Sequence, residues 1–388
     1  MTTVEDVTRY RVAFECLLGV PATEGNQVDV LRNGDEAFPA MLDAIRSASS
    51  TVDLTTFGHW EGTVGREFTD ALVDRARAGV RVRVLLDAYG TRHLDRALIG
   101  RLSDAGAMVE WFRPLSNWRI TQSTHRGHRK LLVCDNRLAF TGGIGIGDRW
   151  RGDAAEPTQW RDTGVRVQGP AVNGLRGAFL NNWAETRRPL YDEGVDPFPE
   201  QPQPGSSAVQ VVRGEAETGW GDLSTLVRAV VGLARRRLRI SASYFVPDAN
   251  ARALLCAAAE RGVSVELIRP GPYMSSQLSK LVSDAQCRHL LEGGVHIWSY
   301  QPTVLQAKVM TVDGVMASVG TATFNSRSLT LDDEVNVVMF DPDVVRTLDA
   351  HLDDDLARSE PVELEEWRRR SFGRRSAEAV PGFLARHL

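Results

Sequence analysis

Two segments of this chain are related to each other, and this duplication constrains the fold more than any other feature of the sequence. HRKLLVCDNRLAFTGG at 128–143 corresponds to QAKVMTVDGVMASVGT at 306–321. Three pairs of residues align at the same offset: Lys130 with Lys308, Asp135 with Asp313, and Gly142 with Gly320. The chain has only three lysines, so chance is a poor account of two at equivalent positions. The repeat is far too long for a solenoid, and we predict two copies of one domain.

The segment between the two copies predicts where they are joined. The segment PFPEQPQPGSS at 197–207 contains four prolines and ends in two serines. This composition is typical of a stiff, polar linker. We therefore expect a first lobe at 1–196 and a second lobe at 208–388.

Each half alternates β-rich runs with helix-like stretches. In the first half, a strand at 52–57 precedes a helix at 64–79 and a buried strand at 80–87. The second half repeats this order, with a strand at 238–245, a helix at 249–262 and a strand at 263–270. The pattern predicts βαβ units, a largely parallel sheet and helices that cover it.

Composition excludes several classes of protein. The chain has 388 residues, 43% of them hydrophobic and 25% charged, with a formal charge of -4, which is typical of a globular protein and disfavours a nucleic-acid coat. The four cysteines form no CxxC pair, which indicates reduced thiols and no zinc site. Arg11 and Glu15 interrupt the apolar N-terminal stretch, so we expect neither a signal peptide nor a membrane span, and a cytoplasmic protein.

Both repeated segments have the form of a β-hairpin that presents polar side chains ahead of its first strand. The turns are predicted at Asp135-Asn136 and Asp313-Gly314, where we favour a structural role for the aspartates. Because a strand alternates faces, His128 and Lys130 project to one side, as do Gln306 and Lys308. If the halves pack about a pseudo-twofold axis, both lysines can share one site, which suits a phosphate.

At this point the chain resembles the phospholipase D superfamily, whose signature is His-x-Lys-x4-Asp followed six residues later by Gly-Gly or Gly-Ser and then by Asn. The first copy matches the signature at His128, Lys130, Asp135, Gly142 and Gly143. The nearest resemblance is to bacterial cardiolipin synthases without membrane anchors, through WRDTGVRVQGPAV, YFVPD and DDEVNVV among other segments. The resemblance implies two phospholipase D-like α/β/α sandwich lobes, related by a pseudo-twofold axis, with the active site at their interface.

The resemblance also implies a mechanism of two in-line displacements at phosphorus. His128 would form a phosphohistidine, and Lys130 and Lys308 would stabilise the phosphoryl oxygens. Asp162 occupies the place from which a carboxylate orients the first histidine, and Glu334 is its counterpart for the second motif. Neither a metal nor a cofactor is implied.

The second copy departs from the signature. Gln306 stands where the superfamily has its second histidine, Gly145 replaces the first asparagine, and Thr323 replaces the second. Glutamine forms hydrogen bonds but cannot shuttle a proton, and a general acid is worth about 10²–10⁴ in rate. We therefore expect either an activated donor, such as a diphosphate conjugate, or another proton donor. His59 is a candidate beside a strand end, whereas His125 is expected at the surface.

Two classes of function remain open. The first is an enzyme, a phosphodiesterase or phosphatidyl transferase of lipid or specialised metabolism, with Gln306, Gly143, Thr323 and His59 as substrate-binding residues. The second is a phosphate-binding or lipid-binding homologue with impaired catalysis. A nuclease is disfavoured by the net acidity. We expect a monomer that acts on a phosphodiester or phospholipid-like substrate, with possible membrane contact through 365–388 and a substrate-facing lip around Trp118.

Overall fold

The computed structural model describes residues 4–58, 60–91, 94–114, 125–186, 188–191, 196, 198–215, 221–274 and 277–368. The first half contributes the strands β1 (Thr23–Arg32), β2 (Thr51–Thr56), β3 (Arg81–Asp87), β4 (Met108–Phe112), β5 (Leu131–Cys134), β6 (Leu138–Gly142) and β7 (Thr163–Gln168). The second half contributes β8 (Ser207–Gly214), β9 (Arg237–Ala242), β10 (Ser264–Pro270), β11 (His296–Tyr300), β12 (Lys308–Val312), β13 (Met316–Gly320), β14 (Glu334–Phe340) and β15 (Ser359–Pro361).

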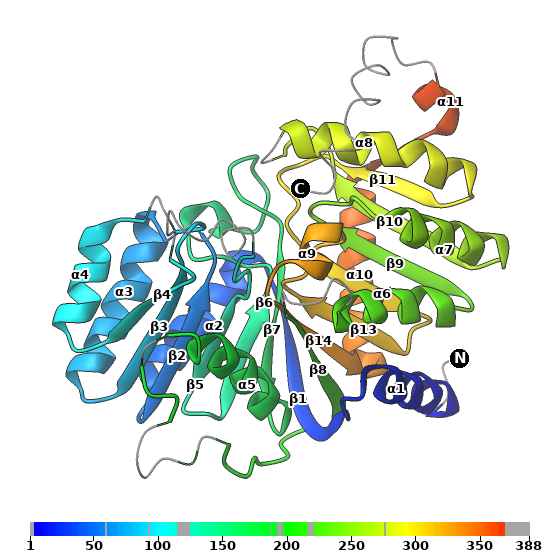
Figure 1. The fold of residues 1–388 in the computed structure, drawn as a ribbon. Helices are drawn as coiled ribbons and strands as arrows, with labels where there is room; N and C mark the ends of the chain where they lie inside the picture. Colours follow the sequence, from blue (N-terminus) through cyan, green and yellow to red (C-terminus); the bar gives the residue numbers. More distant parts are fainter. Residues whose placement is uncertain are drawn as a thin grey trace.

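These strands form one continuous sheet that runs through both halves. Its order is β15-β11-β10-β9-β12-β13-β14-β8-β1-β7-β6-β5-β2-β3-β4. The halves meet where β8 pairs with β14 on one side and with β1 on the other, both antiparallel. The order around this junction is nearly mirrored, which agrees with a pseudo-twofold relation between the halves (Figure 1).

The expectation of a largely parallel sheet is wrong, because the sheet is mixed. Among the strands of the described residues, β2-β3-β4 and β9-β10-β11 pair in parallel, and the other pairs are antiparallel. The parallel groups are the outer strands, which the βαβ pattern described. The strands between these two outer groups pair antiparallel. Tight hairpin turns join β5 to β6 and β12 to β13, whereas β1, β7, β8 and β14 pair over long sequence separations.

Helices cover both faces of the sheet. They are α1 (Val4–Leu18), α2 (Asn33–Ser47), α3 (Gly62–Arg77), α4 (Arg96–Asp104), α5 (Ala171–Trp183), α6 (Asp222–Leu233), α7 (Ala249–Glu260), α8 (Gln277–Glu292), α9 (Ser326–Thr330), α10 (Pro342–Ala357) and α11 (Leu364–Arg368), with a 3₁₀ turn at Asp148–Trp150. Local signals fix several helix starts: the side chains of Asp95, Asp248, Asn325 and Asp341 each accept a backbone N–H in the first turn of α4, α7, α9 and α10.

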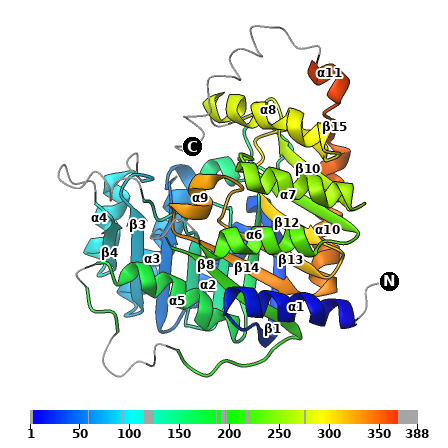
Figure 2. The ribbon, with the colours of Figure 1, turned by 45° about the vertical axis from the view of Figure 1, so that its right-hand side comes forward.

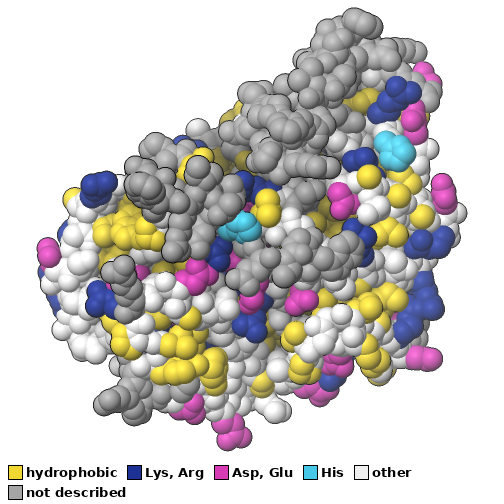
Figure 3. Space-filling model, viewed as in Figure 1, with side chains coloured by type: hydrophobic (Ala, Val, Ile, Leu, Met, Phe, Trp, Pro, Cys, Tyr) yellow, Lys and Arg dark blue, Asp and Glu magenta, His cyan; other side chains and the backbone are white. Residues whose placement is uncertain are grey.

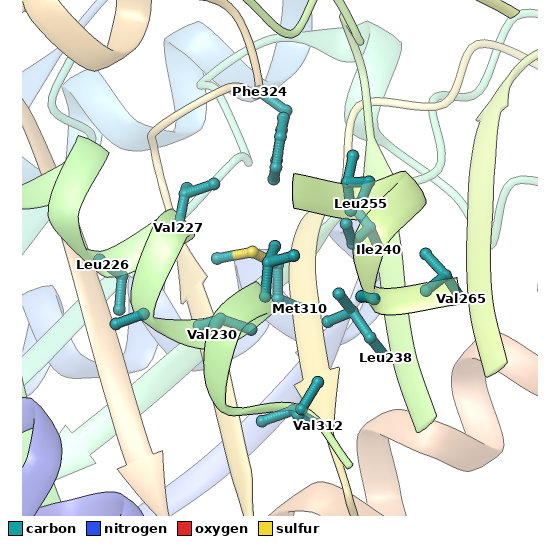
Figure 4. Packing of buried hydrophobic residues seen from close by; sticks show 14 of the residues in the cluster. Leu226, Val227, Val230, Leu238, Ile240, Leu255, Val265, Met310, Val312 and Phe324 are labelled. Atoms are coloured by element: carbon teal, nitrogen blue, oxygen red, sulfur yellow. The ribbon is translucent and has the colours of Figure 1, made fainter. Parts of the chain in front are cut away.

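Three groups of buried apolar side chains hold these layers together. The first-half group joins α2, α3 and α4 to the sheet. The second-half group joins α1, α6, α7 and α8 to the sheet, and Figure 4 shows part of it, with Val230 of α6 near Ile240 of β9 and Met310 of β12. A third group combines α5 and α10 with strands of both halves, so the halves share one core.

Helix α1 begins the chain but packs on the second half. It lies along α6 in Figure 2, and Tyr10, Phe14 and Leu18 are buried in the second-half core. The Tyr10 hydroxyl donates a hydrogen bond of 2.6 Å to the Asp313 carboxylate. The division of the chain into lobes at 1–196 and 208–388, with a linker at 197–207, stays a prediction. Helix α1 belongs to the first of these ranges but packs on the second half.

None of the helices in the described part of the chain is both long enough and apolar enough to cross a membrane. Residues 369–388 and Trp118, on which the expectations of membrane and substrate contact rested, lie outside the described residues.

Candidate active site

The two repeated aspartates hold the two hairpins in the same way. The carboxylate of Asp135 accepts the backbone N–H groups of residues 49–51, which lead into β2. The carboxylate of Asp313 accepts those of residues 235–237, which lead into β9. Both aspartates have a left-handed backbone, with φ of 51° and 53°. Each carboxylate thus fixes its hairpin, and the extended segment before it, against a neighbouring strand.

The segments before the hairpins cross from one half to the other. Gly127 forms a parallel bridge with Asp333, and Leu305 forms one with Arg161. The His128 N–H donates to the Asp333 carbonyl at 2.9 Å, and the Gln306 N–H donates to the Arg161 carbonyl at 2.7 Å. The next residues along each pair of segments are therefore neighbours, which places Glu334 beside His128 and Asp162 beside Gln306.

This crossing corrects the expected roles of the two carboxylates. The Nδ1 atom of His128 lies 2.9 Å from Oε1 and 3.0 Å from Oε2 of Glu334, so Glu334 orients the first histidine. The expectation that Asp162 does so is wrong, because Asp162 lies with the second motif instead. The backbone bridges pair each motif with the carboxylate of the other half.

The surroundings of His128 define which nitrogen is free to react. A carboxylate only accepts hydrogen bonds, so Nδ1 carries the proton and Nε2 keeps its lone pair. Burial lowers the pKa of His128 below its ordinary value, and the charges of Lys130 and Lys308 add to this effect against that of Glu334. The imidazole is therefore neutral at pH 7, and its side chain is 21% exposed. The ring of Phe57 packs edge-on against it, with centroids 4.9 Å apart.

Glu334 is held in its ionised form. Burial alone would raise its pKa, but His128, Lys130 and the Ser328 hydroxyl outweigh burial and keep the pKa of Glu334 below its ordinary value. Ser328 donates a short hydrogen bond to Oε1 of Glu334. The same hydroxyl accepts the backbone N–H of Thr323 at 2.8 Å. Thr323 therefore orients the hydroxyl that holds the Glu334 carboxylate.

Both lysines are buried, and they lie close enough together for their charges to interact. The Nζ atom of Lys130 lies 3.2 Å from Nε2 of His128, and Nζ of Lys308 donates to the Gln306 carbonyl at 2.6 Å. Burial, followed by the charge of Lys308, lowers the pKa of Lys130 to about 7. Burial lowers the pKa of Lys308 as well, against the attraction of Asp162 and Glu334. An anion between the two ammonium groups would relieve this cost.

Among the described residues, Gln306 has no hydrogen bond to a carboxylate that would correspond to the one between His128 and Glu334. Within the described part of the chain, the side-chain amide of Gln306 has no hydrogen-bond partner in this structure. Asp162 instead accepts a hydrogen bond of 2.8 Å from Nε1 of Trp150 and one from its neighbour Thr163. Gly143 lies directly against Asp162, since a Cβ atom at Gly143 would stand 2.2 Å from Oδ1 of that carboxylate.

Asp332 and Arg327 are charged residues near the site that the sequence reasoning missed. Oδ1 of Asp332 accepts the Arg126 N–H at 3.3 Å, and Oδ2 pairs with Nε of Arg327 at 3.3 Å. Burial raises the pKa of Asp332 to about 7; Arg327 opposes this change and Glu334 adds to it. The acidic run DDEV was a usable signal for Asp332. His59 lies outside the described residues, and His125 is half-buried.

Comparison with protein families and curated proteins gives consistent matches. Residues 41–154 and 227–356 match the family described as "Cardiolipin synthase, PLD-like domain". The chain is 32% identical to a probable cardiolipin synthase of Bacillus subtilis over 355 residues, covering 91% of this chain and 71% of the relative. It is 30% identical to cardiolipin synthase 1 of Bacillus anthracis over 369 residues, covering 93% of this chain and 72% of the relative.

Solved structures share the fold at low sequence identity. The phosphatidylserine synthase of Haemophilus influenzae superposes with a TM-score of 0.74 at 14% identity, covering 98% of this chain and 100% of the other. The polyphosphate kinase of Porphyromonas gingivalis gives 0.59 at 13% identity, covering 87% of this chain and 49% of the other. These likenesses show the fold.

Proposed function

Because this chain belongs to the phospholipase D superfamily, in the family of cardiolipin synthase-like domains, we propose that it transfers a phosphatidyl or related phosphoryl group through a phosphohistidine at His128. The family resemblance and the expectation of an enzyme of this superfamily are confirmed by these relatives. The observation that carries the proposal is the geometry of His128, with Nδ1 on Glu334 and Nε2 beside Lys130.

The geometry supports a first step in which Nε2 of His128 attacks phosphorus. The P–O bond to the leaving group breaks, and its electron pair stays on that oxygen. Glu334 stabilises the positive charge that develops on the imidazole, and Lys130 and Lys308 stabilise the phosphoryl oxygens. In the second step an acceptor hydroxyl attacks phosphorus, loses its proton to a base or to solvent, and returns the N–P electron pair to His128.

Gln306 determines which donors suit this site. In an in-line displacement the leaving oxygen lies opposite the nucleophile, on the side of Gln306 and Asp162. Gln306 cannot protonate that oxygen, and Asp332 lies beside Arg126, on the side of His128. A phosphate leaving group has a second pKa of about 6 and departs without protonation. We therefore propose a donor with a diphosphate linkage.

The first test is direct detection of the intermediate. The protein is incubated with a diacylglycerol donor linked by a diphosphate and analysed at neutral pH by mass spectrometry, since an N–P bond hydrolyses in acid. We expect a phosphatidyl adduct on a peptide containing His128, and none in His128→Ala. An adduct elsewhere, or turnover that survives His128→Ala, would contradict the proposal. Gln306→Ala is the matched control and should still form the adduct.

The second test compares donor classes. Turnover of the diphosphate donor should exceed that of an alkyl phosphodiester with the same acyl chains by about 10²–10⁴, the usual contribution of a general acid. Faster cleavage of the alkyl ester would refute the leaving-group argument and point to another proton donor.

Gln306 also favours a second candidate, a phosphate-binding or lipid-binding homologue that has lost efficient catalysis. The same measurements separate the two functions. Stoichiometric binding of the donor with neither adduct nor turnover identifies the binding protein. An ionised Glu334 against His128 favours the enzyme, because a binding protein has little use for an oriented nucleophile.

We propose a phospholipid-like substrate and contact with the membrane surface, in keeping with the names of the relatives. A monomer remains our expectation, because the two halves of one chain already supply both sides of the site. Nucleic acid stays disfavoured on charge.

A further inference from the structure

The two halves differ in the helix that follows their second parallel strand. In the first half α4 has 9 residues, whereas the corresponding helix α8 has 16. Both helices end two residues before a glycine that leads into the next strand, so α4 lacks about the first two turns. Residues 88–91 and 94–95 run there without forming a helix.

A cavity of about 660 Å³ opens where these turns are missing. Its apolar lining, which we call the apolar trough, consists of Ala88, Leu94, Ile99, Trp111 and Pro114. The cavities next to Lys130 and Lys308 have only about 30 and 20 Å³. The volume of about 660 Å³ is typical of pockets for small organic ligands.

Apolar side chains are exposed at this place. Trp111 is 39% exposed although it lies on a strand of the sheet, and Tyr89, which follows the lining residue Ala88, is 47% exposed. Figure 3 shows hydrophobic side chains gathered on the side of the molecule where α4 and β4 lie. Among the described residues that line the cavity, Arg96 is charged and the others are uncharged. This lining is suited to a hydrocarbon chain rather than to a polar ligand.

The end of β3 links the lining of the apolar trough to the segment that leads into the candidate active site. The carboxylate of Asp87 accepts the Gly127 N–H at 3.0 Å and the Tyr89 N–H at 2.9 Å. Gly127 immediately precedes the nucleophile, and Ala88 immediately follows Asp87. Arg126 also lies over the ring of Tyr89, with 5.8 Å to the centroid. One side chain therefore connects the floor of the trough to the segment that carries His128.

We propose that the apolar trough binds one acyl chain of the lipid donor whose phosphate lies between His128 and the two lysines. This inference rests on the proposed function, because it takes the ligand to be a phospholipid-like molecule. In the described part of the second half, α8 occupies the place equivalent to the trough. The donor would thus bind in one orientation across the pseudo-twofold axis.

The test measures chain preference in binding, without turnover. Dioctanoyl and dibutanoyl phosphatidic acid, both below the concentrations at which they aggregate, are titrated into the full chain by calorimetry. The two lipids share a headgroup and differ only in methylenes. We expect the dioctanoyl lipid to bind about 10-fold to 10²-fold more tightly, with a more negative heat-capacity change.

Two variants should remove this preference by different means. Trp111→Lys places a cation in the apolar trough, and Ala88→Phe fills it. Both should bring the two affinities to within about 2-fold by weakening the dioctanoyl lipid alone. Tyr273→Lys is the matched control: it changes an aromatic residue of similar exposure, 40%, in the second half and should leave the preference intact.

The outcomes separate this proposal from the proposed function. Equal affinities of the parent for the two lipids would overturn the proposal that the trough binds an acyl chain. A preference for the dioctanoyl lipid that persists in both trough variants, with unchanged melting temperatures, would also overturn it. Equal loss in Tyr273→Lys would do the same. If His128→Ala keeps the chain preference while the parent forms no phosphohistidine, the trough stands and the proposed reaction fails. A phosphohistidine without chain preference gives the reverse result.

Discussion

The two halves of this molecule have the same backbone arrangement at the site but carry different side chains there. In each half an aspartate fixes the hairpin, a lysine faces the centre, and the segment before the hairpin bridges to the other half. Because these segments cross between the halves, Glu334 contacts His128. Asp162 is placed beside Gln306 in the same way, but it accepts a hydrogen bond from Trp150 and not from Gln306. Backbone pairing therefore maintains the symmetry of the site, and one side chain breaks it.

The largest expected difference is between the two carboxylates. Glu334→Gln should slow adduct formation at His128 by about 10²–10⁴, because a neutral amide no longer stabilises the imidazolium. Asp162→Asn should slow it by less than about 10-fold, since Asp162 makes no hydrogen bond to His128. Single-turnover rates give both values, and melting temperatures show whether either variant is misfolded. Equal losses would mean that the halves are functionally equivalent.

Restoring the symmetry should increase activity toward poor leaving groups. Gln306→His places an imidazole beside Asp162 and Lys308, where it can donate a proton to an alkoxide. We expect turnover of an alkyl phosphodiester to rise by about 10-fold to 10²-fold, with little change for a diphosphate donor. Gln306→Asn is the control, and a gain with asparagine would rule out proton transfer as the cause.

The turn aspartates sharpen the comparison through stability. Asp135→Ala leaves three backbone N–H groups without their acceptor and should lower the free energy of unfolding by about 1–3 kcal/mol. Asp135 also accepts the hydroxyls of Ser49 and Ser50, but these hydrogen bonds are exposed, whereas that from Tyr10 to Asp313 is buried. Asp313→Ala should therefore cost about 1 kcal/mol more than Asp135→Ala. Urea unfolding measures both, and Tyr10→Phe should account for the difference. A smaller loss for Asp313→Ala would contradict this role of Tyr10.

The smallest expected effect concerns the charge of Lys130. Its pKa of about 7 in the empty site means that an anion binds together with a proton. Sulfate, which does not titrate in this range, should therefore bind up to about 10-fold more weakly at pH 8 than at pH 6. The steepest change should come as Lys130 loses its proton above pH 7. Lys130→Arg should flatten this dependence and Lys308→Arg should retain most of it, as calorimetry would show.

Much of the fold could be predicted because its signals are local. The hairpin turns follow from Asp135-Asn136 and Asp313-Gly314, and the outer βαβ units follow from periodicity. The antiparallel centre was missed, since β1, β7, β8 and β14 pair over long sequence separations without a turn signal. Likewise, α1 is amphipathic, but no local pattern indicates which half it covers.

The candidate site was predictable in its residues and not in their partners. Repetition identified Lys130 and Lys308, because few lysines occur and two are repeated, and the family resemblance identified His128. The exchange of Glu334 and Asp162 could not be read from the sequence, since it depends on bridges between segments of different halves. The pKa of Asp332 also depends on burial that only the assembled halves create.

The packing of α1 on the second half has a consequence for synthesis on the ribosome. Tyr10 and its acceptor Asp313 are 303 residues apart in the chain. At about 5–20 residues per second, the helix emerges roughly 15–60 s before its docking surface exists. During that interval Tyr10 and Phe14 have no buried place to occupy. A segment translated well before the second half is thus among the last that can reach its native position.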